Sequence, residues 1–127
     1  MPQLYCGDCL EIMPQIADKS VDCIICDLPY GTTACKWDIV IPLDKLWVQY
    51  ERIIKDRGAI ILFGQEPFSS ALRMSNPGMY RYDWVWQKQK PSNFQLMNYQ
   101  CGRVHENIMV FSKANACYSE NGDTMLY

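Results

Sequence analysis

The sequence predicts an α/β fold with a mostly parallel sheet and a late antiparallel strand pair. Two short apolar runs, residues 21–26 and 58–64, have the length and composition of buried strands. Between them, residues 43–54 carry apolar side chains at helical spacing. A strand, a helix and a strand with short joins form a βαβ unit, which favours a parallel sheet. At 127 residues the chain is expected to be a single domain, residues 1–127.

The N-terminal third is expected to hold a short strand, a short helix and the first buried strand. Residues 3–6 are compatible with a strand, and Asp8 followed by Glu11 has the spacing of a capping box that opens a helix ending near Ile16. The strand at 21–26 then stops abruptly in the sequence Asp-Leu-Pro-Tyr-Gly.

The middle and C-terminal segments complete the expected fold. The helix at 43–54 has one apolar face, and Pro42 and Gly58 flank it as helix punctuation. That face consists of Leu43, Leu46, Trp47, Tyr50, Ile53 and Ile54. A second helix is expected at 67–75, and two late strands at 80–86 and 107–111 can pair antiparallel across a long loop. Alternation in the first of these strands places Tyr80, Tyr82, Trp84 and Trp86 on one side.

Composition indicates a folded protein rather than a disordered or membrane-spanning one. Hydrophobic residues make up 49% of the chain and aromatic residues 13%, which is enough for a core. We expect no membrane span, because no apolar run reaches about 18 residues. The first residues lack a basic region and an apolar signal core, so a cytoplasmic location is expected.

Charge is distributed unevenly, which suggests where an anionic partner would bind. The net charge is −2, but residues 67–119 hold six basic and two acidic side chains, whereas residues 1–66 hold six basic and ten acidic ones. The loop at 87–106 interleaves basic, amide and aromatic residues, as suits a strand of DNA. Candidate DNA-binding residues are Lys88, Lys90, Asn93 and Arg103. An ordinary solvated surface loop explains the same pattern equally well.

The exit of the first buried strand carries the candidate chemistry. In open α/β sheets, ligands bind at the carboxyl ends of the strands, where Asp27 and Tyr30 are expected. The Asp27 carboxylate and the Leu28 carbonyl, held by the rigid Leu28-Pro29 geometry, supply two acceptors for one planar amino group. The Tyr30 ring supplies a face for a planar heterocycle. A turn cap is the competing explanation. In the loop that follows, Trp37 can stack on a base or pack, and packing is favoured.

Four segments resemble the amino-group DNA methyltransferases, which methylate adenine N6 or cytosine N4. Asp-Leu-Pro-Tyr at 27–30 resembles their Asp-Pro-Pro-Tyr motif, with Leu28 in place of the first proline. Tyr-Cys-Gly-Asp-Cys-Leu-Glu at 5–11 with Ser-Val-Asp at 20–22, Trp-Val-Trp-Gln-Lys at 84–88, and His-Glu-Asn-Ile-Met-Val-Phe-Ser-Lys at 105–113 resemble three more segments, in the family's β-type order.

The resemblance implies a Rossmann-like, S-adenosylmethionine-dependent fold and double-stranded DNA as substrate, as in restriction-modification and prophage enzymes. The acid at the first motif position favours adenine N6. Asp27, Leu28, Pro29 and Tyr30 would form the catalytic motif around a flipped base, with direct methyl transfer to its amino nitrogen. Asp8, Cys9 and Asp27 would contact the cofactor, and no metal is implied.

The family's glycine-rich turn, Phe-x-Gly-x-Gly, is absent from this sequence. The resemblance therefore implies an incomplete methyltransferase, whether a truncation, a split gene or a degenerate prophage copy. We expect a missing C-terminal part or a partner chain to complete the cofactor site, and weak or no activity without it.

Two other functions remain open at this stage. One is a non-catalytic DNA-binding remnant that uses the basic second half. The other is a zinc-ribbon module through Cys6, Cys9, Cys23 and Cys26, whose paired spacing is typical of zinc ligands. Strand geometry argues against it, because residues three apart, such as Cys23 and Cys26, point to opposite faces of a strand. We expect buried, reduced thiols instead.

Overall fold

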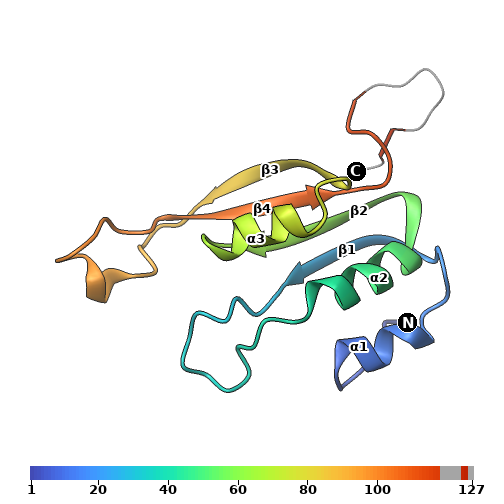
Figure 1. The fold of residues 1–127 in the computed structure, drawn as a ribbon, viewed down its shortest axis with the longest axis horizontal. Coiled ribbons are helices and arrows are strands. Elements are labelled where there is room, and N and C mark those ends of the chain that lie inside the picture. The colour runs from blue at the N-terminus through green and yellow to red at the C-terminus, as the bar shows by residue number, and fades with distance from the viewer. Residues whose placement is uncertain (118–123, 126–127) are drawn as a thin grey trace.

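The computed structural model describes residues 1–117 and 124–125, and within them one mixed four-stranded sheet (Figure 1). The strands are β1 (Val21–Asp27), β2 (Ile54–Gly64), β3 (Tyr80–Gln87) and β4 (His105–Phe111), in the order β1-β2-β4-β3. The predicted α/β class and the late antiparallel pair, β3 with β4, are confirmed. The expected mostly parallel sheet is wrong: β1 and β2 are parallel, but β4 inserts antiparallel between β2 and β3. The hairpin return of the chain through the 88–104 loop reverses its direction, and this leaves one parallel pair.

The helices gather on one face of the sheet (Figure 1). They are α1 (Cys9–Ile12) with a following 3₁₀ turn (Met13–Gln15), α2 (Leu43–Ile53) and α3 (Phe68–Ser75), and a further 3₁₀ turn lies at Phe94–Leu96. Their apolar side chains meet Ile60 and Leu62 of β2 and Met109 and Phe111 of β4, all of them without exposed surface. This layer is the main hydrophobic core.

Helix α2 forms the centre of that core, as its apolar stripe predicts. Leu46, Trp47, Tyr50 and Ile53 are buried. The Trp47 indole also donates from Nε1 to the Ser75 hydroxyl at 2.7 Å, which ties α2 to α3. The helix passes directly into β2 at Ile54. Residues 55–57, which lay between the predicted helix and the predicted strand, therefore belong to the strand.

The expected strand at residues 3–6 is wrong, because these residues are exposed and make no strand pairing. Helix α1 does begin where the capping pattern predicts. The Asp8 side chain caps it by accepting from the Leu10 backbone N–H at 2.8 Å.

The opposite face of the sheet is largely uncovered. Ala114 and Met125 pack there against Ala59 and Val110, beside an apolar groove of about 750 Å³. On the same face, Ile25 of β1 is 67% exposed, because its neighbours Ile24 and Cys26 point to the helix-side core. Its strand, β1, is an edge strand with β2 as its one sheet neighbour among the described residues.

A bulge in β3 changes the predicted alternation of its aromatic residues. The register shifts between Tyr80 and Tyr82. Tyr80 consequently packs edge-on against Phe111 in the helix-side core, with ring centroids 5.7 Å apart. Tyr82 instead joins the cluster on the other face. The prediction that Tyr80 shares a side with Tyr82, Trp84 and Trp86 is therefore wrong.

In the part of the chain that the structure describes, no helix is both long enough and apolar enough to cross a membrane.

Candidate active site

The strand β1 delivers Asp27 to the end of the sheet as its last residue, paired with Phe63 of β2. The Asp27 side chain is exposed, whereas the next residue, Leu28, is 5% exposed and belongs to the helix-side core. Burial of the Leu28 side chain fixes the backbone at the strand exit. Outside the helices and strands, no described backbone N–H donates to the Leu28 carbonyl.

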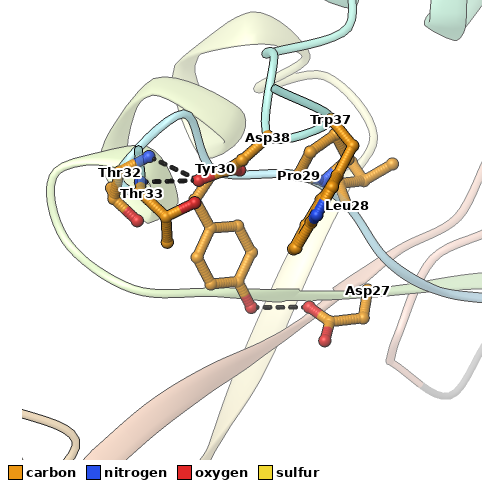
Figure 2. A pocket seen from close by; sticks show the side chains of 8 residues that line it. All are labelled: Asp27, Leu28, Pro29, Tyr30, Thr32, Thr33, Trp37 and Asp38. Carbon is orange, nitrogen blue, oxygen red and sulfur yellow. Dashed lines mark hydrogen bonds between the residues drawn. The ribbon is translucent and has the colours of Figure 1, made fainter. Parts of the chain in front are cut away.

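Tyr30 is held between Asp27 and Phe68. Its hydroxyl donates to Asp27 Oδ1 at 2.7 Å, and its ring stacks on Phe68 with centroids 5.1 Å apart and planes 27° apart (Figure 2). Burial, and after it the hydrogen bond to Asp27, raises the pKa of the Tyr30 hydroxyl. The hydroxyl is therefore a proton donor at neutral pH, which orients the carboxylate and occupies one of its two oxygens.

Asp38 organises the loop that follows Tyr30. Its Oδ1 accepts from Gly31 N at 2.8 Å, and its Oδ2 accepts from Thr32 N at 2.9 Å and Thr33 N at 2.7 Å. The Thr33 side chain, followed by the backbone N–H groups of Gly31, Thr33 and Thr32, lowers the pKa of Asp38 to about 2. Gly31 has φ +68°, and a Cβ there would lie 2.8 Å from Val40 Cγ2. The loop is therefore a closed ring around one buried carboxylate.

These elements line an open pocket of about 350 Å³ at the strand exit (Figure 2). It is lined by Asp27, Leu28, Pro29, Tyr30, Thr32, Thr33, Trp37 and Asp38. All four residues of the predicted catalytic motif thus lie on one pocket. Trp37 is 74% exposed, so the expectation that it packs is wrong, because the closed loop carries it on the pocket side and away from the core.

Substituting Asp38 with asparagine is expected to destabilise the protein at neutral pH, because one oxygen cannot accept all three backbone N–H groups. Asp38 has a lower pKa in the folded chain than its ordinary value of 3.8, so its stabilisation is present above about pH 4. It is lost as the pH falls through about 2. Urea unfolding between pH 2 and pH 7 checks this. The difference in free energy of unfolding between the parent and Asp38→Asn should become smaller as the pH falls.

A matched control for that series is Asp44→Asn, since Asp44 is an exposed acid in the first turn of α2. A difference in free energy of unfolding between the parent and Asp38→Asn that stays constant from pH 7 down to pH 2 would contradict the role given to the Asp38 charge.

The predicted cofactor residues are not all brought together. Asp27 lines the pocket, but Asp8 and Cys9 do not. Asp8 caps α1, and Cys9 is half-buried against the core, where burial and then the Asp8 charge raise the pKa of its thiol.

The four predicted DNA-binding residues fall into two groups. Lys88 forms an ion pair with Glu106 and lies over the Trp86 ring, and the Asn93 side chain bridges the loop by bonding the backbone of Cys101 and Arg103. Lys90 and Arg103 are exposed, and no ion pair involves either of them in the described part of the chain. The loop that carries them projects beyond the same end of the sheet as the pocket loop (Figure 1).

The cysteines do not gather. All seven lie in described residues and are free, five of them exposed and two, Cys9 and Cys26, half-buried. The expectation of buried thiols is wrong for the five exposed cysteines, because Cys23 lies on the uncovered sheet face and the other four lie in loops. In residues 1–117 and 124–125, no group of three or more metal-binding side chains is placed to hold an ion. The zinc-ribbon alternative therefore has no supporting geometry.

Two residues of the site were missed by reasoning from the sequence. Asp38 had a detectable signal, since an acid that closes a Gly-Thr-Thr turn is typical of side-chain-capped loops. Phe68 had none, because its contact with Tyr30 joins α3 to the exit of β1 across 38 residues of sequence.

No protein-family model matches the chain. It is 25% identical over 119 residues to the type II methyltransferase M1.MboII of Moraxella bovis, a match that covers 84% of this chain and 44% of that protein. The M1.HpyAVI–SAM complex matches with a TM-score of 0.66 and 21% identity, over 91% of this chain and 58% of that one.

A second solved structure supports the same fold. The cytosine-N4-specific PvuII DNA methyltransferase matches with a TM-score of 0.61 and 13% identity, over 87% of this chain and 48% of that one. The four-stranded sheet thus corresponds to part of a methyltransferase fold. The chain is a distant homologue of type II DNA methyltransferases and spans about half the length of the relatives it matches.

Proposed function

We propose that this chain is the base-binding part of a site-specific DNA methyltransferase that methylates adenine N6 with S-adenosylmethionine in the cytoplasm. The observation that carries the proposal is the Asp27–Tyr30 pair, hydrogen-bonded at 2.7 Å on an open pocket at the end of β1. The homology to type II DNA methyltransferases supports it. A flipped base presents an amino group and a flat ring, and the pocket offers acceptors and an aromatic face.

Asp27 and Leu28 perform the chemistry available to this chain. The Asp27 oxygen that Tyr30 leaves open accepts one N–H of the amino group, and the Leu28 carbonyl accepts the other. Two acceptors fix the plane of the amino group and raise electron density on its nitrogen, the atom that forms the new bond. S-adenosylmethionine, when bound, supplies an activated methyl group on its sulfonium. Pro29 restricts the turn that aims both acceptors.

The cofactor site is proposed to need a further polypeptide segment. Of Asp8, Cys9 and Asp27, Asp27 alone lines the pocket, so the chain offers one side of a cofactor site. The outer edge of β1 is unpaired in the described residues, and the sheet face with Ile25 is uncovered. We propose that the completing segment packs there, whether it belongs to a longer chain or to a partner, because β1 forms a parallel pair with β2 and parallel strands are usually covered on both faces.

The 88–104 loop is proposed to contact the DNA backbone through Lys90 and Arg103. Replacing either with alanine is expected to weaken binding to double-stranded DNA for all sequences alike. Each substitution should also reduce the slope of log affinity against log salt by about 0.9, because one phosphate contact is lost. Fluorescence anisotropy between 50 and 200 mM salt measures the slope.

The control for this series is Lys45→Ala, which removes an exposed lysine of α2 that is distant from the loop in sequence. A slope reduced equally by Lys45→Ala and by Lys90→Ala would mean that the loop holds no specific phosphate site.

The function itself is tested by incubating the chain, extended by a glycine-rich segment that completes the cofactor site, with unmethylated genomic DNA and methyl-labelled S-adenosylmethionine. Mass spectrometry of the digested nucleosides identifies the product. N6-methyldeoxyadenosine above the level of an Asp27→Ala sample supports the proposal, and N4-methyldeoxycytidine would correct the base. Calorimetry with S-adenosylmethionine distinguishes this function from the alternative, a non-catalytic DNA-binding remnant. Such a remnant would bind DNA but would neither bind nor consume the cofactor, even when extended by a glycine-rich segment.

A further inference from the structure

We propose that Trp37 forms the second wall of the base site and stacks on the face of the base opposite Tyr30, with Asp38 as its positioning residue. The inference rests on the proposed function, because it names the residue that completes the same pocket. It starts from an aromatic side chain that the fold leaves exposed.

The Trp37 indole is 74% exposed and lines the pocket with Tyr30 (Figure 2). Tryptophan is highly buried on average in folded proteins, so an exposed indole on a pocket is informative. Trp84 and Trp86 are also partly exposed, but each contacts another ring, Tyr82 and Phe63 respectively. In the described residues Trp37 contacts no other aromatic ring, so its faces are available to a ligand.

The loop holds Trp37 in place although the side chain is exposed. Its neighbour Asp38 is 8% exposed and binds three backbone N–H groups, those of Gly31, Thr32 and Thr33. The Asp38 N–H also donates to the Cys35 carbonyl at 3.0 Å, which closes the turn that contains Trp37. A ring carried on an ordered loop loses less conformational freedom when a ligand binds, and this preorganisation favours binding.

The neighbours of Tyr30 decide which side a base can occupy. Phe68 stacks on one face of the Tyr30 ring, with the ring centroids 5.1 Å apart, so a ligand can reach only the other face of that ring. That face opens on the pocket that Trp37 also lines, with the Asp27 carboxylate where the Tyr30 hydroxyl ends (Figure 2). A flat heteroaromatic group that enters the pocket therefore meets Tyr30 on one side and Trp37 on the other. Stacking of this kind binds any base, whereas the acceptor at Asp27 selects for an amino group.

This division of roles gives the test. Single-stranded oligomers of abasic residues carry one central residue that is adenine, purine without the amino group, or a further abasic residue, so the central residue holds the one base, and anisotropy gives the affinity of the full chain for each. Trp37→Ala is expected to weaken binding of the adenine and purine strands about tenfold while leaving the abasic strand unchanged. Trp37→Phe should stay within about threefold of the parent, because a ring face remains. Asp27→Asn should instead reduce the preference for adenine over purine.

The matched control is Trp84→Ala, which removes a partly exposed indole that lines the groove on the far sheet face, and it should stay within about twofold of the parent. Circular dichroism confirms that each variant is folded. Equal binding of the adenine strand by Trp37→Ala and the parent overturns the inference, and so does a parent that binds the abasic strand as tightly as the adenine strand. A Trp37 effect without any preference for adenine over purine keeps the stacking wall but rejects amino-group recognition in the proposed function.

Discussion

Replacing Asp27 with alanine is expected to lower the rate of methyl transfer by about 100- to 1000-fold, the usual effect of removing one preorganised polar group from the reacting centre. The carboxylate is the last residue of β1, is exposed on the pocket and is oriented by the Tyr30 hydroxyl at 2.7 Å. Without it, the amino group of the base keeps the Leu28 carbonyl as its one acceptor, and its nitrogen is neither held in plane nor enriched in electron density. The measurement is turnover with methyl-labelled S-adenosylmethionine in a protein whose cofactor site is complete.

The control for this experiment is Asp44→Ala, because Asp44 is an exposed acid of similar chemistry at the start of α2. Its turnover should match the parent. Asp27→Asn retains one oxygen acceptor and should fall between the parent and Asp27→Ala. Near-normal turnover of Asp27→Ala would remove this side chain from the mechanism.

Phe68→Ala is expected to lower the free energy of unfolding by about 3–5 kcal/mol, because it removes a large buried side chain and leaves a cavity. Phe68 is 6% exposed at the start of α3 and belongs to the helix-side core. The loss is large compared with the roughly 5–15 kcal/mol that stabilises a typical domain. Tyr30 also loses the ring that backs it at 5.1 Å, so base binding should weaken in the fraction that remains folded. Urea unfolding gives the first quantity, and the oligonucleotide assay gives the second.

Met74→Ala on the same helix is the control, since Met74 is 73% exposed, and its unfolding free energy should lie within about 0.5 kcal/mol of the parent. Phe68→Leu keeps most of the buried volume but no ring face. It should recover most of the stability and little of the base binding. An unfolding free energy for Phe68→Ala within roughly 1 kcal/mol of the parent, the scale of an average substitution, would show that the core does not depend on this ring.

Local patterns in the sequence predicted much of the fold. The stripe on α2 identified the buried residues correctly, from Leu46 to Ile53, because helical spacing is a property of the segment itself. The strand exit at Asp27 was correct for a similar reason, since the apolar run and the proline that follows it act within one short segment. Residues 3–6 show the limit: they resemble a strand, but a strand needs a partner and none pairs with them.

The candidate site also has features that the sequence predicted and features that it did not. The motif at residues 27–30 was identified from the sequence, and the structure places all four residues on one pocket, while their catalytic roles stay predictions. The exposure of Trp37 and the ring formed around Asp38 were not predicted, because both depend on how residues 31–38 close on themselves. Lys88 was predicted to bind DNA, but its position beside Glu106 follows from the pairing of β3 with β4.

The sequence by itself determined most of the elements and the chemical groups at the strand exit, because periodicity, turn residues and motif spacing act within short segments. Tertiary structure alone decided that β4 runs antiparallel between β2 and β3, that Phe68 backs Tyr30, and that Asp8 does not line the pocket at Asp27. Each of these depends on contacts between segments far apart in the chain. Such contacts form where they bury the most apolar surface and satisfy the most backbone groups, and no single segment encodes that balance.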